Sequence, residues 1–312
     1  MSRGNPSLER AASVLALLSA EPERDFTLAE IVRQTELSKA TVHALLASLT
    51  SNRWLLRYPA GPSYRLGPGL IALGEAARQG YPELPYAQDK MRELGTQLGL
   101  ECMASAVVGS EIVILAKSGA TVPLSSTAGI GQRVPLVPPL ATVFFAWSQD
   151  EAIEAAFAPW AGSASKLTES YRRGLRAVHD RGFAMGLENP VRERLGRTLA
   201  TQLARGQFGT REAAQLLGDL TDEDYQLIEL ERTGSYWLSY LAAPIFDAVG
   251  RVSLALTLVG FPRQLRGDEV IRYGKLLRAA CDEVTEAVHG HEPIAHGATA
   301  YDREFTPMEA VR

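Results

Sequence analysis

Cysteine is scarce in this sequence, and its scarcity excludes two kinds of architecture. Only Cys102 and Cys281 occur among the 312 residues. Two cysteines cannot build a disulfide framework or a four-cysteine zinc site. We therefore expect both to be buried as small hydrophobic side chains.

Histidine is almost as sparse. The five histidines are His43, His179, His289, His291 and His296. None of them lies near a serine motif or a cysteine, so a nucleophile, a base and an orienting acid cannot be assembled from them. The sequence predicts no catalytic site, no metal site and no cofactor.

Long apolar runs are also missing. No segment approaches the ~18 uninterrupted apolar residues of a membrane span, and the first six residues lack the apolar core of a secretory signal. We expect a cytoplasmic protein that does not associate with membranes. Hydrophobic residues make up 46% of the chain and charged residues 22%, which excludes a disordered or fibrous protein.

The charge is unevenly distributed along the chain. Residues 1–67 carry a formal charge of +2 and the remainder carries -6, within a total of -4. Attraction to phosphates acts within about a Debye length, ~8 Å, so a small basic module on an acidic body can still bind nucleic acid. An excess of two charges is weak support for this when taken alone.

Apolar periodicity predicts a first helix from Pro6-Ser7 to about Ala20. Its apolar stripe is Leu8, Ala11, Ala12, Leu15 and Leu18. A capping box of Thr27 and Glu30 opens a second helix that runs through Thr35, and Ser38 caps a third. The predicted buried faces are Leu28, Ile31 and Val32 on the second helix and Val42, Leu45, Leu46 and Leu49 on the third. Two helices joined by a short turn and braced by another helix form a helix-turn-helix.

A hairpin is expected directly after the third helix. Residues 54–58 and 63–66 are short extended runs, and residues 59–62 form a turn rich in proline and glycine. A hairpin in this place is a wing. The candidate DNA contacts are Ser38, Lys39, Ala40, Thr41 and His43 on the helix and Arg57, Tyr64 and Arg65 on the wing. The alternative is the solvated charged face of an ordinary three-helix bundle.

A second domain follows a linking helix. The pattern predicts helices over 86–99, 141–147, 150–157, 170–181 and 268–289, and strands over 101–108, 111–117, 236–246 and 251–259. Helices mixed with antiparallel hairpins favour an α+β fold. The expected domains are residues 5–67, a linker helix at 68–84, a larger domain at 85–291 and a disordered tail at 292–312.

Residues 7–67 resemble the winged helix of the IclR family of bacterial transcriptional regulators. The matching residues are Leu37, Ser38, Lys39, Thr41, Val42, His43, Tyr64, Leu66 and Gly67, whereas Ala44 stands where the family commonly has arginine. The resemblance implies binding to double-stranded operator DNA by a homodimer or a dimer of dimers. It also implies that a small-molecule effector modulates this binding.

The remainder of the chain resembles the GAF-like effector-binding domain of the same family, with an antiparallel sheet. The resemblance lies in residues 131–136, 181–184 and 241–247. It implies that the effector-binding residues are Val134, Leu140, Ala141, Tyr240, Thr257 and Val259. Valine, leucine and alanine also suit a plain hydrophobic core. Because this set is less polar than usual for the family, we expect an aromatic or acyl effector.

Residues 188–232 form an insertion relative to that family. Their richness in arginine and glutamate suits a lid or a contact surface for another subunit, and equally a solvent-exposed addition without a function of its own.

The sequence also leaves a second function open for the whole protein. In this alternative, the protein is a GAF-like small-molecule sensor or enzyme whose N-terminal domain binds a protein instead of DNA.

Overall fold

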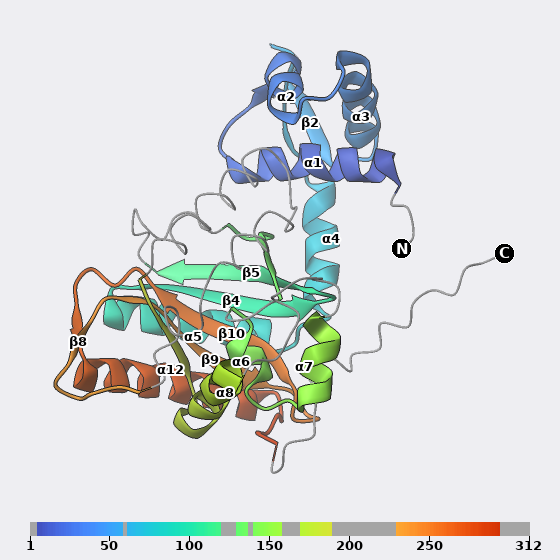
Figure 1. Cartoon of the computed structure of the whole chain (residues 1–312). Coiled ribbons are helices and arrows are strands. Elements are labelled where there is room, and N and C mark those ends of the chain that lie inside the picture. The colour runs from blue at the N-terminus through green and yellow to red at the C-terminus, as the bar shows by residue number, and fades with distance from the viewer. Residues whose placement is uncertain are drawn as a thin grey trace. The chain divides into compact units, whose positions relative to one another are not determined.

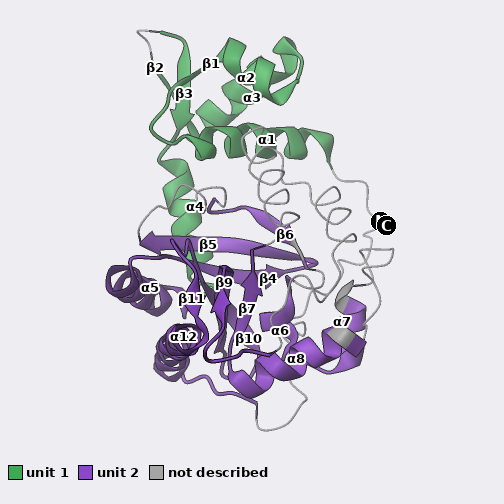
Figure 2. Cartoon of the chain, turned by 60° about the vertical axis from the view of Figure 1, so that its left-hand side comes forward, with its two compact units in different colours: residues 1–82, 198–209 green, residues 83–197, 210–312 purple. Residues whose placement is uncertain are grey.

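The computed structural model describes residues 5–58, 61–119, 129–136, 140–157, 169–188 and 229–293. The described residues form two compact units, the first ending at Pro82 and the second beginning at Glu83 (Figure 2). Most of the predicted insertion at 188–232, and the predicted tail beyond residue 293, lie outside the described residues.

The first unit combines four helices with a small sheet (Figure 1). Its elements are α1 (Pro6–Ala20), β1 (Phe26–Thr27), α2 (Leu28–Thr35), α3 (Lys39–Ser51), β2 (Leu55–Tyr58), β3 (Ser63–Leu66) and α4 (Gly69–Arg78). The strands pair antiparallel in the order β1-β3-β2. The capping box, the serine cap and the hairpin predicted from the sequence are all confirmed.

The predicted buried face of α1 is partly wrong. Leu18 is buried and Leu15 packs against the core of the unit, as predicted, but Leu8 is 67% exposed, whereas Val14 and Leu17 outside the predicted stripe are buried beside Phe26. Residues 14, 17 and 18 are spaced by three and four residues, as the predicted stripe is, so periodicity allowed either face. Packing against α2, α3 and the sheet selected the face that carries Val14.

The second unit is built around one antiparallel sheet. Its elements are α5 (Leu84–Leu98), β4 (Glu101–Val108), β5 (Glu111–Gly119), β6 (Arg133–Pro135), α6 (Thr142–Phe145), α7 (Asp150–Phe157), α8 (Glu169–Arg181), β7 (Ala184–Leu187), β8 (Ser235–Tyr236), β9 (Leu238–Phe246), β10 (Val252–Val259), β11 (Leu265–Arg266) and α12 (Gly267–Ala287). Six strands pair in the order β6-β5-β4-β10-β9-β7. The predicted α+β class with an antiparallel sheet is confirmed.

Helices cover both faces of this sheet. In Figure 1, α5 and α12 lie against one face and α6 and α8 against the other. Cys102 on β4 and Cys281 on α12 are buried and not disulfide-bonded, as predicted. Burial raises the pKa of the Cys102 thiol to about 12. The cysteines therefore contribute to the core between the sheet and the helices α5 and α12.

Three features of the second unit differ from the sequence-based expectation. The predicted strand over 236–246 is divided, because β8 pairs with β11 in a separate two-stranded sheet. The short strands β6 and β7 had not been predicted. The disordered tail does not begin at Glu292, because the Glu292 carboxylate accepts hydrogen bonds from Trp147 Nε1 at 2.6 Å and from an Nη atom of Arg278 at 2.6 Å.

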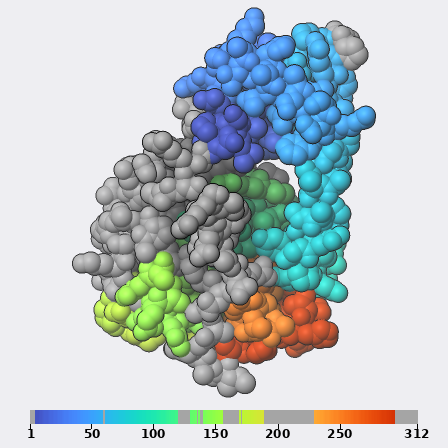
Figure 3. Space-filling model, turned by 90° about the vertical axis from the view of Figure 1, so that its right-hand side faces the viewer, coloured from blue at the N-terminus to red at the C-terminus, as the bar shows by residue number. Residues whose placement is uncertain are grey.

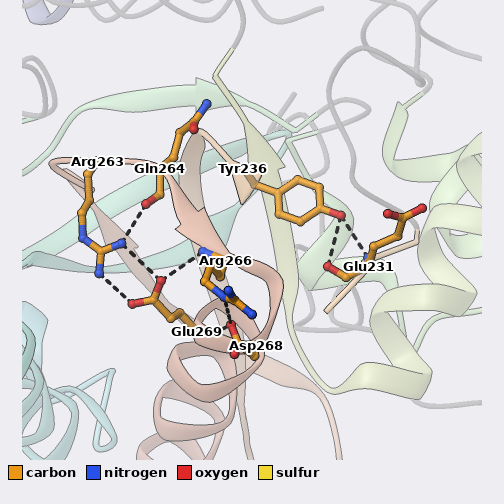
Figure 4. Close-up of polar contacts among 7 residues, drawn as sticks. All are labelled: Glu231, Tyr236, Arg263, Gln264, Arg266, Asp268 and Glu269. Carbon is orange, nitrogen blue, oxygen red and sulfur yellow. Dashed lines mark hydrogen bonds and ion pairs between the residues drawn. The ribbon is translucent and has the colours of Figure 1, made fainter. Parts of the chain in front are cut away.

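A polar network closes the N-terminus of α12 (Figure 4). The Glu269 carboxylate accepts hydrogen bonds from the Arg263 guanidinium at 2.6 Å and from the backbone N–H of Arg266 at 3.0 Å. Beside it, the Tyr236 hydroxyl accepts a hydrogen bond from the backbone N–H of Glu231 at 2.9 Å. These contacts fix the connection between the small β8-β11 sheet and the helix.

Two glutamates that cap helices make the stability of the fold depend on pH. Contacts with Thr27 and Arg24 lower the pKa of Glu30 to about 2, and Arg263 and the Arg266 N–H lower that of Glu269 to about 2. A lowered folded-state pKa stabilises the fold above the unfolded value of about 4.5, and this stabilisation is lost as the pH falls toward 2. We expect Glu269→Gln to unfold at lower urea concentration than the parent at pH 7. The difference should shrink at pH 3, and an equal difference at both pH values would contradict the assignment.

Candidate functional site

The start of α3 presents a polar surface held by a local cap. The Ser38 hydroxyl accepts a hydrogen bond from the backbone N–H of Thr41 at 3.1 Å, and the two hydroxyls lie 2.9 Å apart. Ser38, Lys39, Ala40 and His43 are exposed and Thr41 is half-buried. The cap thus fixes the helix while leaving a cation, an imidazole and two hydroxyls at one end of it. Such groups bind phosphates and base edges.

The wing adds arginines to this surface. Arg57 on β2 is exposed, whereas Arg65 on β3 is half-buried and forms an ion pair with Asp25 at 2.7 Å. The Arg65 guanidinium also lies 5.0 Å from the centre of the Tyr58 ring. Asp25 therefore neutralises part of the charge that Arg65 offers, and the ion pair ties the wing to the loop before β1.

Tyr64 is not exposed, contrary to the sequence-based expectation. It is buried in the core of the first unit and lies opposite Phe26 and Arg57 in the sheet. Tyr64 alternates with its neighbours along β3, so its ring points into the core while Ser63 and Arg65 lie on the other face. Its role in the wing is therefore packing.

The predicted effector residues lie on one face of the large sheet, the face covered by α6 and α8. Ala141, Tyr240 and Val259 belong to the apolar cluster on this face, and Val134 and Leu140 pack against it. Thr257 is half-buried and lies opposite two residues of the same cluster, Met103 and Ala242. Residues directly opposite each other in antiparallel strands share a face, so Thr257 lies on this face too.

Tyr240 occupies a place that requires a glycine beside it. The two residues are paired across β9 and β7, and a Cβ atom built on Gly186 would lie 2.2 Å from the Tyr240 ring. The Tyr240 ring therefore lies flat over β7. Gly186 was not singled out from the sequence, because a glycine between apolar residues gives no indication of which side chain approaches it.

Arg181 adds a positive charge near this tyrosine. It ends α8, its Nε donates a hydrogen bond to the backbone oxygen of Phe183 at 2.9 Å, and its charge interacts with Tyr240. Burial lowers the pKa of Arg181 to about 10, which leaves the guanidinium charged at neutral pH.

The described residues contain no group of three or more side chains able to hold a metal ion. Within the same part of the chain, no helix is long and apolar enough to cross a membrane.

Comparison with known families identifies the first unit. Residues 7–59 match the IclR helix-turn-helix domain, which covers α1 to α3 and β2. The first unit therefore contains an IclR helix-turn-helix domain. The matched residues include the whole of the Ser38-capped helix α3.

Curated relatives agree with this assignment. The glycerol operon regulatory protein of Streptomyces griseus is 42% identical over 76 residues, which are 24% of this chain and 30% of that protein. The transcriptional regulator XynR of Escherichia coli is 26% identical over 188 residues, 58% of this chain and 74% of that protein.

Solved IclR structures share the fold over most of the chain. An IclR transcriptional regulator from Alicyclobacillus acidocaldarius has a TM-score of 0.59 at 20% identity, covering 92% of this chain and 100% of that one. An IclR homolog from Microbacterium hydrocarbonoxydans, solved in complex with 4-hydroxybenzoate, has a TM-score of 0.54 at 16% identity and covers 90% and 98% of the two chains.

Proposed function

We propose that this protein is a cytoplasmic regulator of the IclR family that binds operator DNA through α3 and the β2-β3 wing, and that a small molecule bound by the second unit changes its affinity for DNA. The observation that carries the proposal is the capped polar start of α3 followed directly by a hairpin with exposed or half-buried arginines. The proposed contacts are Ser38, Lys39, Ala40, Thr41, His43, Arg57 and Arg65.

The effector is an aromatic or acyl compound. Support comes from the apolar cluster around the proposed effector residues, which would bury a hydrophobic ligand body. Only Tyr240 and Thr257 among the proposed residues offer side-chain hydroxyls. The homolog from Microbacterium hydrocarbonoxydans was solved in complex with 4-hydroxybenzoate, which is aromatic.

The working form is a homodimer or a dimer of dimers. Support comes from α4, which contains no buried residue and exposes Ile71 and Leu73. Figure 3 shows the side chains of this helix, coloured light blue, lying open on the surface. A second copy that covered these side chains would remove apolar area from water and would place two copies of α3 on successive half-sites.

The proposal is tested with DNA taken from upstream of the protein's own gene. We expect a gel shift at nanomolar protein, and a footprint of two half-sites separated by about one helical turn of ~10 base pairs. A screen of aromatic and acyl acids by thermal shift should identify a compound that raises the melting temperature and changes the gel shift. If the protein binds random duplex and upstream DNA equally well, or if it binds neither of these DNAs, the proposed function is wrong.

A further inference from the structure

An ion pair between a buried glutamate and a half-buried lysine lies on the face of the sheet that carries the proposed effector residues. The Lys117 ammonium is 2.5 Å from a Glu101 carboxylate oxygen, and the two side chains are 20% and 4% exposed. Glu101 begins β4 and Lys117 lies near the end of β5. Neither residue was singled out in the sequence.

The register of the sheet places this pair beside the proposed effector residues. Glu101 lies directly opposite Val259, which lies opposite Tyr240. Lys117 lies opposite Met103, which lies opposite Thr257. Neighbouring strands are ~4.8 Å apart, so the backbones of Lys117 and Thr257, two strands apart, are separated by roughly 10 Å. A substituted aromatic ring spans that separation.

A β-bulge is what brings Lys117 to this face. Between the turn and Ser105 the pairing is regular, but the register shifts after Ser105, which pairs with Ile114, so that Ala104 pairs with Ala116 and Leu115 is the extra residue. Without the shift, Lys117 would lie opposite Cys102, whose side chain faces α5 and α12. Because a slip of one residue moves a side chain to the other face, the bulge determines which face receives the charge.

The pair is poorly explained by stability alone. Removing two charges from water is costly, and apolar residues of similar volume often replace a buried ion pair with no loss of stability. The Glu111–Arg133 pair between β5 and β6 is different, because its arginine is 48% exposed and keeps its contact with water. A buried pair beside an apolar cluster suits the recognition of a polar group on a ligand.

We propose that Glu101 and Lys117 bind a hydroxyl group of the effector, an inference that rests on the proposed effector site. A carboxylate only accepts hydrogen bonds and an ammonium only donates them. A ligand hydroxyl can donate to Glu101 and accept from Lys117 at the same time. A second carboxylate at this position would be repelled by Glu101, and an apolar group would make no hydrogen bond to either charge. The effector is therefore a hydroxylated aromatic or acyl compound.

Matched probes test this inference on the full-length protein. The probes are 4-hydroxybenzoate with benzoate, and 4-hydroxyphenylacetate with phenylacetate, with binding measured by isothermal titration calorimetry. We expect the parent protein to bind at least one hydroxylated probe about tenfold or more tightly than its partner, because a hydrogen bond to a charged group is lost with the hydroxyl.

The variant Glu101→Gln/Lys117→Met removes both charges together, so that neither is left buried and alone. It should bind the two members of a probe pair with similar affinity, whereas the control Glu111→Gln, also on β5, should keep the parent's preference. Thermal melting checks that each variant is folded. If the double variant is not, Glu101→Gln alone is used, because it leaves only the more exposed Lys117 without its carboxylate partner and should also reduce the preference.

Each outcome bears on one proposal. Equal affinity of the parent for both members of each pair, no binding of any hydroxylated probe, or a preference that survives in a folded variant would overturn the role of Glu101 and Lys117. A gel shift with upstream DNA is measured in parallel. Loss of the hydroxyl preference in the variant together with an absence of DNA binding by the parent would overturn the proposed function and leave this inference standing.

Discussion

Trp147→Ala is expected to lower the free energy of unfolding of the second unit by about 3–5 kcal/mol, as substitutions of buried aromatic residues by alanine commonly do. Trp147 is 1% exposed. Its ring packs edge-on against Phe246 with the ring centres 5.2 Å apart, and its Nε1 donates a hydrogen bond to Glu292. The substitution leaves a cavity beside the sheet and removes one of the two side-chain hydrogen bonds to Glu292.

Trp147→Phe is the matched control. It keeps an aromatic ring in the same place but removes the donor to Glu292, whose carboxylate still pairs with Arg278 at 2.6 Å. We expect a smaller loss, of about 1–2 kcal/mol. Urea unfolding followed by circular dichroism measures both variants. Equal stability of the alanine and phenylalanine variants would mean that burial of the ring contributes little, contrary to the packing.

The elements of the first unit could be predicted because their determinants are local. The Thr27–Glu30 capping box, the Ser38 cap and the proline- and glycine-rich turn of the wing each act over a few residues. Because such a contact involves only neighbouring residues, it can be predicted without knowledge of the rest of the fold. The same applies to the β4-β5 hairpin, whose turn at Gly109-Ser110 is visible in the sequence.

The features that could not be predicted depend on contacts between distant segments. The strand β1 exists only because Phe26 and Thr27 pair with β3, about forty residues later in the sequence. The short strands β6 and β7 likewise acquire strand geometry from longer neighbours. Segments of two to four residues are too short to show periodicity, and these strands lack the hairpin turn that marked β2 and β3, so no pattern indicated them.

In the candidate effector site, too, features set by local sequence could be predicted and features set by strand pairing could not. The alternation of β10 correctly placed Thr257 and Val259 on one face, because that rule needs only the strand itself. The face of Lys117 could not be deduced from the hairpin turn, because a regular register would have paired it with Cys102. The bulge at Leu115 has no glycine to mark it, and it is visible only in the paired strands.

Substitutions at the start of α3 are expected to separate affinity for DNA from sequence preference. Lys39 is an exposed cation and is expected to contact phosphate. Lys39→Ala should weaken binding to operator and to random duplex alike, and should reduce the slope of log affinity against log salt by about 0.9. His43 is exposed one turn further along the helix. His43→Ala should cost about 1–3 kcal/mol on the operator and much less on random duplex, because it removes a base contact.

The control for both substitutions is Arg176→Ala on α8, which removes one positive charge from the second unit. Because the Debye length is ~8 Å at physiological salt, a charge outside the proposed DNA contacts on α3 and the wing contributes little to DNA binding. The salt slope of this variant should match that of the parent. Fluorescence anisotropy with both duplexes from about 50 to 200 mM salt measures all three variants. If Arg176→Ala weakened DNA binding as much as Lys39→Ala did, the net charge of the protein rather than the start of α3 would account for the affinity. The proposal that α3 is the DNA-recognition helix would then be wrong.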